Sequence, residues 1–170
     1  MIRPEVTVDP RNKIILARME KAWREIGESV VTETAMWTQR RVVKNTPRDR
    51  GMAQASVKFS VAEAQQGFDS IWTGSVYSEL ENNQYMAVLE HGRKPNSRMP
   101  PRQQMEIWVR RHFPGKSEVE LKGLTFQIRR AIARRGLPAH KMFQQAFEAA
   151  GPFMNKTLKR EMQKFTSRMS

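Results

Sequence analysis

The chain has 170 residues, of which 39% are hydrophobic, and a formal net charge of +13 at pH 7. This composition supports one modest hydrophobic core and excludes wholesale disorder. The absence of cysteine excludes disulfide scaffolds, thiolate zinc sites and cysteine nucleophiles. No apolar stretch is long enough to span a bilayer and no signal peptide is recognisable, so we expect a non-membrane protein made in a cytoplasm.

Positive charge is concentrated in one part of the sequence. Residues 1–91 contain 12 Lys and Arg and 12 Asp and Glu, whereas residues 92–141 contain 13 and 3. A basic segment on a neutral body predicts a surface that meets a polyanion or an acidic partner. The alternative, in which arginine-rich helices only keep one side solvated, stays open.

The N-terminal part predicts a long amphipathic helix from about Arg11 to Asn45. Asp9-Pro10 is a suitable start, and Thr46-Pro47 ends the helix because the residue before a proline avoids helical backbone angles. Such a helix is roughly 50 Å long, more than one small core needs. Its stripe recurs at three- or four-residue steps with one wider gap: Ile15, Met19, Trp23, Ile26, Val30, Trp37 and Arg41.

Two alternating segments follow and predict an antiparallel hairpin. Ala55, Val57, Phe59 and Val61 alternate with polar residues, and Gln65-Gln66-Gly67 indicates a turn. A second strand over 70–78 places one set of residues on one face, namely Trp72, Gly74 and Val76, and another on the opposite face, namely Ile71, Thr73, Ser75 and Tyr77.

The remainder predicts helices separated by a loop. Tyr85 to His91 is ambiguous between a strand and a helical turn, and residues 93–101 contain three prolines and read as a loop. A short helix starts at Pro101 or Arg102 and ends before Pro114-Gly115. Ser117 and Glu120 fit a capping box that opens a helix ending at Gly136. The last helix carries an apolar stripe of Phe143, Phe147, Ala150, Met154, Leu158, Met162 and Phe165, interrupted at Gly151-Pro152.

These elements predict an α+β fold, with a long N-terminal helix, a small antiparallel sheet and C-terminal helices. We expect a single domain over residues 1–170. Its parts are the long helix (1–45), the hairpin with the segment ending in Glu90-His91-Gly92 (46–91), the basic loop and helices (92–141), and the C-terminal helix (142–170).

No motif indicates an enzyme. The histidines His91, His112 and His140 lack metal-ligand spacing, so we expect no metal site, cofactor or catalytic residue. Glu120-Leu121-Lys122 with Asp69 resembles the carboxylates and lysine of a metal-dependent nuclease. Because Glu120 falls where a helix cap needs it, we favour the structural interpretation.

The basic cluster is the stronger candidate. Arginine offers paired, planar donors that suit phosphate or carboxylate, and no aromatic residues interleave with the cluster to stack on bases. Whether these residues meet DNA or protein stays open. The candidate interface or lumen residues are Arg93, Lys94, Arg98, Arg102, Arg129, Arg130, Arg134 and Arg135.

Several motifs in order resemble one family. These motifs are, in chain order, Thr46-Pro47-Arg48-Asp49-Arg50-Gly51 with Ser56, Tyr85-Met86-Ala87-Val88-Leu89-Glu90-His91-Gly92, Met99-Pro100-Pro101, Ile107-Trp108-Val109, the helix over 128–136 and Pro138 to Phe143. Together they resemble motifs of the tail-completion (neck) proteins of tailed bacteriophages. Arg50 departs from the family's usual threonine, and Met86 stands where alanine is common. The motif residues are Pro47, Asp49, Gly51, Glu90 and Gly92, for which a purely structural role as turn and contact residues is expected.

This resemblance implies a mechanical function as a virion protein assembled in the host cytoplasm. Family members form a homo-oligomeric ring, by analogy a hexamer, at the head–tail junction around a DNA channel. The implied partners are a head connector or stopper protein and a tail terminator or tail tube protein, with non-specific DNA in the lumen. The alternative from another class is a stand-alone, non-specific DNA-binding protein, and a nuclease is the third.

Overall fold

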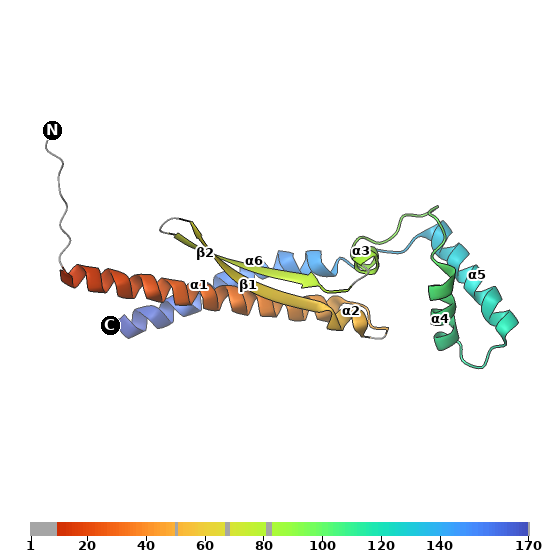
Figure 1. The fold of residues 1–170 in the computed structure, drawn as a ribbon, viewed down its shortest axis with the longest axis horizontal. Helices are drawn as coiled ribbons and strands as arrows, with labels where there is room; N and C mark the ends of the chain where they lie inside the picture. The colour runs from red at the N-terminus through yellow and green to blue at the C-terminus, as the bar shows by residue number, and fades with distance from the viewer. Residues whose placement is uncertain (1–9, 50, 67–68, 81–82, 170) are drawn as a thin grey trace, which may run out of the picture. The chain divides into compact units, whose positions relative to one another are not determined.

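The computed structural model describes residues 10–49, 51–66, 69–80 and 83–169 and has a mixed α and β architecture (Figure 1). The predicted α+β class, with its long first helix, two-stranded antiparallel sheet and C-terminal helices, is confirmed. The chain groups into two compact units, which are described separately. Unit 1 lies within residues 1–79 and 143–170, and unit 2 within residues 80–142. The single domain over 1–170 stays a prediction.

Helix α1 (Pro10–Asn45) is continuous through its β-branched centre and ends before Thr46-Pro47, as predicted. Three buried threonines, Thr34, Thr38 and Thr46, each donate a hydroxyl hydrogen bond of 2.7 Å to the carbonyl four residues earlier. The hydroxyl therefore stays paired while the small side chain lets other elements approach the helix closely. The predicted start at Asp9 lies outside the described residues.

Strands β1 (Val57–Gln66) and β2 (Asp69–Ser78) pair in antiparallel register, with Phe59 opposite Val76 and Val61 opposite Gly74. The predicted faces are confirmed, because Val57, Phe59 and Val61 are buried or half-buried whereas Lys58 and Ser60 are exposed. One detail of the prediction was wrong, because Gln65 and Gln66 continue the strand rather than forming the turn. The third predicted turn residue, Gly67, lies outside the described residues.

The hairpin packs on α1 where glycine permits close approach. A Cβ atom on Gly27 of α1 would lie 2.7 Å from the indole of Trp72, and one on Gly74 would lie 3.1 Å from Val31. An ion pair of 2.6 Å between Arg24 of α1 and Glu63 of β1 also joins the helix to the hairpin. The hydrogen bond from Arg24, followed by one from Ser70, lowers the pKa of the Glu63 carboxyl.

The connection from α1 to the hairpin contains a short helix that the sequence did not predict. Helix α2 (Met52–Ala55) follows Gly51, whose φ of 76° confirms the expected left-handed turn. The predicted assignment of Ala55 to the strand was therefore wrong. Alternation with Ser56 suggested a strand, but Ala55 completes the helical turn through a hydrogen bond of 2.8 Å from its N–H to the carbonyl of Gly51.

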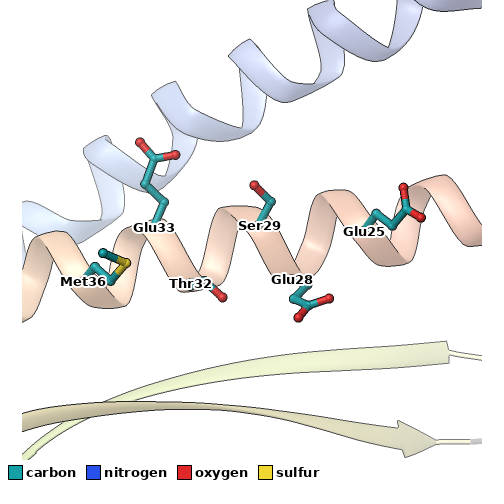
Figure 2. A pocket seen from close by; sticks show the side chains of 6 residues that line it. All are labelled: Glu25, Glu28, Ser29, Thr32, Glu33 and Met36. Carbon is teal, nitrogen blue, oxygen red and sulfur yellow. The ribbon is translucent and has the colours of Figure 1, made fainter.

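Helix α6 (Met142–Met169) packs against α1 through aromatic rings. Trp37 stacks on Phe153 with ring centroids 4.6 Å apart, and Trp23 lies 6.2 Å from Phe165. The guanidinium of Arg41 lies over the ring of Trp37, 5.2 Å from the ring centroid. These contacts give α1 two packed sides, one toward the hairpin and one toward α6 (Figure 2).

The predicted apolar stripe of α6 was correct in part: Phe143, Ala150, Leu158 and Phe165 are half-buried, but the fully buried residues lie beside the stripe. Ala146 and Thr157 are buried, whereas Phe147, Met154 and Met162 are 48%, 40% and 40% exposed. The helix also continues through Gly151-Pro152, which was expected to interrupt it. The choice of face follows the small residues, because alanine and threonine allow the two helices to approach while Phe153 fills the space beside Trp37.

Unit 2 contains α3 (Asn83–His91), α4 (Arg102–His112) and α5 (Glu118–Arg135). The ambiguous segment before Gly92 is therefore a helix. Helix α4 begins after Pro101 as predicted and buries Val109 completely. The Ser117–Glu120 capping box is confirmed in both directions, and α5 ends at Gly136 as predicted.

Candidate functional site

Backbone hydrogen bonds join the proline-rich loop to the C-terminal end of α5. Arg93 and Leu137 exchange two bonds of 2.9 and 3.0 Å, and Ser97 donates one of 3.0 Å to the carbonyl of Ala133. Gly92 and Gly136 permit this pairing, since both have positive φ and any Cβ would collide with backbone atoms. A Cβ on Gly136 would overlap the carbonyl oxygen of Arg93.

This pairing places the two basic segments of the sequence next to each other. We call the resulting surface the basic junction and define it as Arg93, Lys94, Arg98, Arg129, Arg130, Arg134 and Arg135. Its loop and helix parts contact directly, because Arg129 donates a hydrogen bond of 2.7 Å from Nε to the carbonyl of Pro100. Arg134 and Arg135 stand in the last turn of α5, where the helix dipole favours positive charge.

Among the described residues, the seven junction residues have no carboxylate partner, whereas other cationic residues of unit 2 do. Arg102 pairs with Glu106 at 2.7 Å, so this predicted residue is largely satisfied within its own helix. Near the start of α5, Arg110 pairs with Glu118 and Lys116 with Glu120. Within the part of the chain that the structure describes, none of the seven junction residues forms a salt bridge. Their positive charges can therefore pair with anionic groups of another molecule.

A surface pocket of about 460 Å³ opens in the junction. Arg93 is held at its rim by hydrogen bonds from Nε to the Ser97 hydroxyl, at 2.9 Å, and from Nη2 to the Arg98 carbonyl. The sequence did not indicate this pocket, because its walls come together only through the pairing of loop and helix. The pocket is lined by Arg93, Arg98, Met99, Pro100, Pro101 and Arg129.

The remaining motif residues occupy structural positions. Pro47 and Asp49 follow α1, and Gly51 provides the left-handed turn before α2. Glu90 lies half-buried near the end of α3, where its carbonyl accepts a bond of 3.2 Å from the N–H of Lys141. Gly92 has a φ of 72° and lies against the backbone of residues 137–139. The Glu90 bond is made by its backbone carbonyl, so the contact role expected of its carboxylate stays a prediction, as do the functional roles of the other motif residues.

The nuclease hypothesis gains nothing from the position of Glu120. Its carboxylate accepts bonds of 2.9 Å from both the N–H and the hydroxyl of Ser117, and Lys116 approaches at 3.0 Å. The backbone bond from Ser117, with the bond from Lys116 next in weight, lowers the pKa of Glu120 to about 2. The carboxylate is thus occupied in capping α5. The side chain of Asp69 lies outside what the structure describes.

The histidines are also engaged in local contacts or exposed. The ring of His112 stacks on Trp108 at 4.0 Å, and its Nδ1 lies 2.9 Å from the Trp108 carbonyl. His91 and His140 are exposed. Across the described ranges, no three His, Asp or Glu side chains gather in a way that suits a metal ion.

A second concavity lies on unit 1, along α1, with a volume of about 410 Å³. Three glutamates line it, Glu25, Glu28 and Glu33, and Glu33 points toward α6 (Figure 2). Two of them are already neutralised, Glu25 by Lys21 at 3.9 Å and Glu33 by Arg160. This groove therefore has less uncompensated charge than the junction, whose arginines form no salt bridge with any described carboxylate.

No described helix is both long and apolar enough to cross a membrane. Comparisons of the chain with protein-family models, with curated proteins and with solved structures found no match.

Proposed function

We propose that this chain is a structural virion protein of a tailed bacteriophage, a tail-completion or neck component that joins the head connector to the tail. In this role it assembles as a homo-oligomeric ring, by analogy a hexamer, around a DNA channel. Its partners are a connector or stopper protein on one side and a tail terminator or tail tube protein on the other. The work is mechanical and requires no catalytic residue, metal or cofactor.

The observation that carries this proposal is the basic junction. Seven cationic side chains stand on a loop and helix fixed to each other by backbone hydrogen bonds, with no carboxylate partner among the described residues. Assembling like charges without compensation costs free energy, so their retention is understandable where an external anion neutralises them. The proposal that the assembly is a phage neck rests on the order of the motifs in the sequence.

Exposed apolar side chains on α1 support a multi-copy assembly. Ile14, Ile15 and Leu16 are 57%, 49% and 57% exposed, and Trp23 is 46% exposed. Leu16 and Trp23, seven residues apart, lie on the same side of the helix, and exposed apolar side chains on one side are of the kind that protein contacts cover. A ring requires contacts that close between different surfaces of neighbouring copies, and a long helix suits this need.

Charge reversal in the phage that encodes the chain tests the proposal. Arg130→Glu with Arg134→Glu should abolish joining, so that electron microscopy of lysates shows separate heads and tails. A matched control, Lys156→Glu with Lys159→Glu, reverses two exposed charges on α6 and should leave assembly intact. Normal particles and genome delivery with the junction variant would contradict the proposal. Cryo-electron microscopy of intact particles should place the chain at the head–tail junction.

The alternative, a stand-alone non-specific DNA-binding protein, is favoured by the same unpaired arginines. Titration with duplex DNA at increasing salt separates the two. Sub-micromolar binding by the free chain with a steep salt dependence would support the alternative, since phosphate contacts release counterions.

A further inference from the structure

We propose that the pocket in the basic junction is a carboxylate-binding site, which takes acidic side chains from a loop or terminus of a partner protein. The inference rests on the proposed function only in taking the partner to be a protein. It goes further by naming the chemistry of the contact and by assigning it to Arg93, Arg98 and Arg129 rather than to the junction as a whole.

The arginines at this pocket are positioned before any ligand arrives. Arg129 is held through Nε by the Pro100 carbonyl at 2.7 Å, and Arg93 through Nε by the Ser97 hydroxyl at 2.9 Å. Fixing Nε orients the planar guanidinium and reduces the entropy lost on binding. In the described part of the chain, the Nη groups of Arg129 and the whole guanidinium of Arg98 have no hydrogen-bond partner. These donors suit the two oxygens of a carboxylate.

The lining of the pocket favours an acidic side chain over a nucleic acid backbone. Half of the lining residues are Met99, Pro100 and Pro101, and the half-buried Met99 and exposed Pro101 offer apolar surface to the methylene groups of aspartate or glutamate. A protein that binds the DNA backbone contacts its phosphates with exposed positive charges spread along a surface, and a protein that binds single strands also stacks aromatic rings on the bases. The volume of about 460 Å³ lies in the usual range for binding pockets. It admits a short acidic segment.

The segment that forms the pocket is rigid enough to act as a preformed receptor. Ser97 and Arg93 are both tied to the end of α5 by backbone bonds, and Pro100 is buried. Two consecutive prolines further restrict the backbone at positions 100 and 101. The partner therefore meets a surface that needs little rearrangement, which favours specificity over general attraction to charge.

Nuclear magnetic resonance titration of the isotope-labelled full chain tests this inference. The probe is a blocked hexaglutamate peptide at about 150 mM salt, where distant charges are screened. We expect saturable shifts of the Arg93 and Arg129 Nε–H signals and of backbone amides over residues 93–101. A hexaglutamine peptide of equal length should cause no such shifts. A 20-base-pair duplex is the competing probe.

Three single-residue variants decide between a pocket and diffuse electrostatic attraction. Arg98→Ala should weaken peptide binding about tenfold, the effect of losing hydrogen bonds to a charged group. Lys122→Ala, which removes an exposed charge of α5 outside the basic junction, should weaken it less than twofold. Arg98→Lys keeps the charge but not the planar fork and should give an intermediate loss. Thermal unfolding verifies that each variant is folded.

Equal weakening by Arg98→Ala and Lys122→Ala would overturn the inference, as would tighter binding of the duplex than of the peptide at the same signals. Failure here is distinguishable from failure of the proposed function. Peptide binding in the pocket together with normal assembly of the Arg130→Glu, Arg134→Glu phage would retain the pocket and reject the neck role. The reverse pair of results would retain the neck role alone.

Discussion

The two units hold their parts together in different ways. In unit 1, α1 carries the hairpin on one side and α6 on another through side-chain packing: Trp72 over Gly27, Trp37 on Phe153, and buried threonines between them. In unit 2, the loop over residues 93–101 is held mainly by backbone hydrogen bonds to α5. Side chains that pack against each other are buried in that contact, whereas backbone hydrogen bonds leave the side chains of the paired residues free to contact another molecule. The second arrangement therefore suits a surface that must present its charges to a partner.

The largest effect is expected from breaking the backbone pairing in unit 2. Gly136→Ala introduces a Cβ that overlaps the Arg93 carbonyl oxygen, at φ 74° and ψ −163°, a conformation essentially restricted to glycine. We expect unit 2 to lose about 3 kcal/mol of unfolding free energy, from backbone strain and overpacking together. Hydrogen exchange at the amides of Arg93, Ser97 and Leu137 should accelerate in parallel.

Gly115→Ala is the matched control for this change. Gly115 also has a positive φ, 87°, but no atom lies within 4 Å of the position that a Cβ would take there. Only the conformational strain of about 1 kcal/mol should remain. Equal losses for the two variants would show that the loop contact contributes little and would weaken the contrast between the units.

A smaller effect is expected from disrupting the packing in unit 1. Phe153→Ala removes the ring stacked on Trp37 at 4.6 Å. Because Phe153 is half-buried, we expect a loss of about 2 kcal/mol, below the value for a fully buried ring. Phe147→Ala removes the same side chain from a position 48% exposed on the same helix and should change stability by less than about 0.5 kcal/mol. Urea unfolding followed by tryptophan fluorescence measures both, and similar losses would contradict the assigned face of α6.

The glycine in α1 offers a test in which two effects oppose each other. Gly27→Ala raises helix propensity by about 1 kcal/mol but forces a Cβ to within 2.7 Å of the Trp72 indole. Since overpacking costs about 1–3 kcal/mol, we expect a net loss of about 1 kcal/mol. Gly123→Ala in α5, where nothing lies within 4 Å, should instead stabilise the chain by about 0.5 kcal/mol. Thermal unfolding should shift in opposite directions for the two variants.

The smallest effect concerns the charge of the helix cap in unit 2. The pKa of Glu120 is lowered from 4.5 to about 2 in the folded chain, so its stabilising effect is complete above pH 4.5 and lost as the pH falls toward 2. Glu120→Gln keeps the shape but cannot titrate. The stability of the wild type should therefore fall more steeply than that of the variant between pH 4.5 and 2. Parallel curves from circular dichroism would show that the cap does not depend on the charge.

Local patterns in the sequence were sufficient for most elements. The ends of α1 and α5, the two faces of the hairpin and the Ser117 cap follow from propensity, alternation and capping chemistry, which act over a few neighbouring residues. The errors occurred where neighbouring signals were compatible with two outcomes. Ala55 fits a strand by alternation and a helix by propensity, and only its hydrogen bond to Gly51 decides.

The buried face of α6 illustrates a limit of periodicity. Its sequence offers two adjacent stripes, one with Phe147, Met154 and Met162 and one with Ala146, Phe153 and Thr157. Hydrophobicity alone favours the first, yet Ala146 and Thr157 are buried and Phe153 is half-buried, because the small residues fit against α1 and Phe153 stacks on Trp37. The partner surface, which no local pattern contains, selected the face.

The sequence by itself determined the α+β class, the glycines that turn the chain and the concentration of arginine between residues 92 and 141. Tertiary structure alone decided that the loop and the end of α5 form one surface with a pocket. The physical reason is that Arg93 and Leu137 pair across a long stretch of chain, and such pairing depends on where α4 and α5 have placed the two segments.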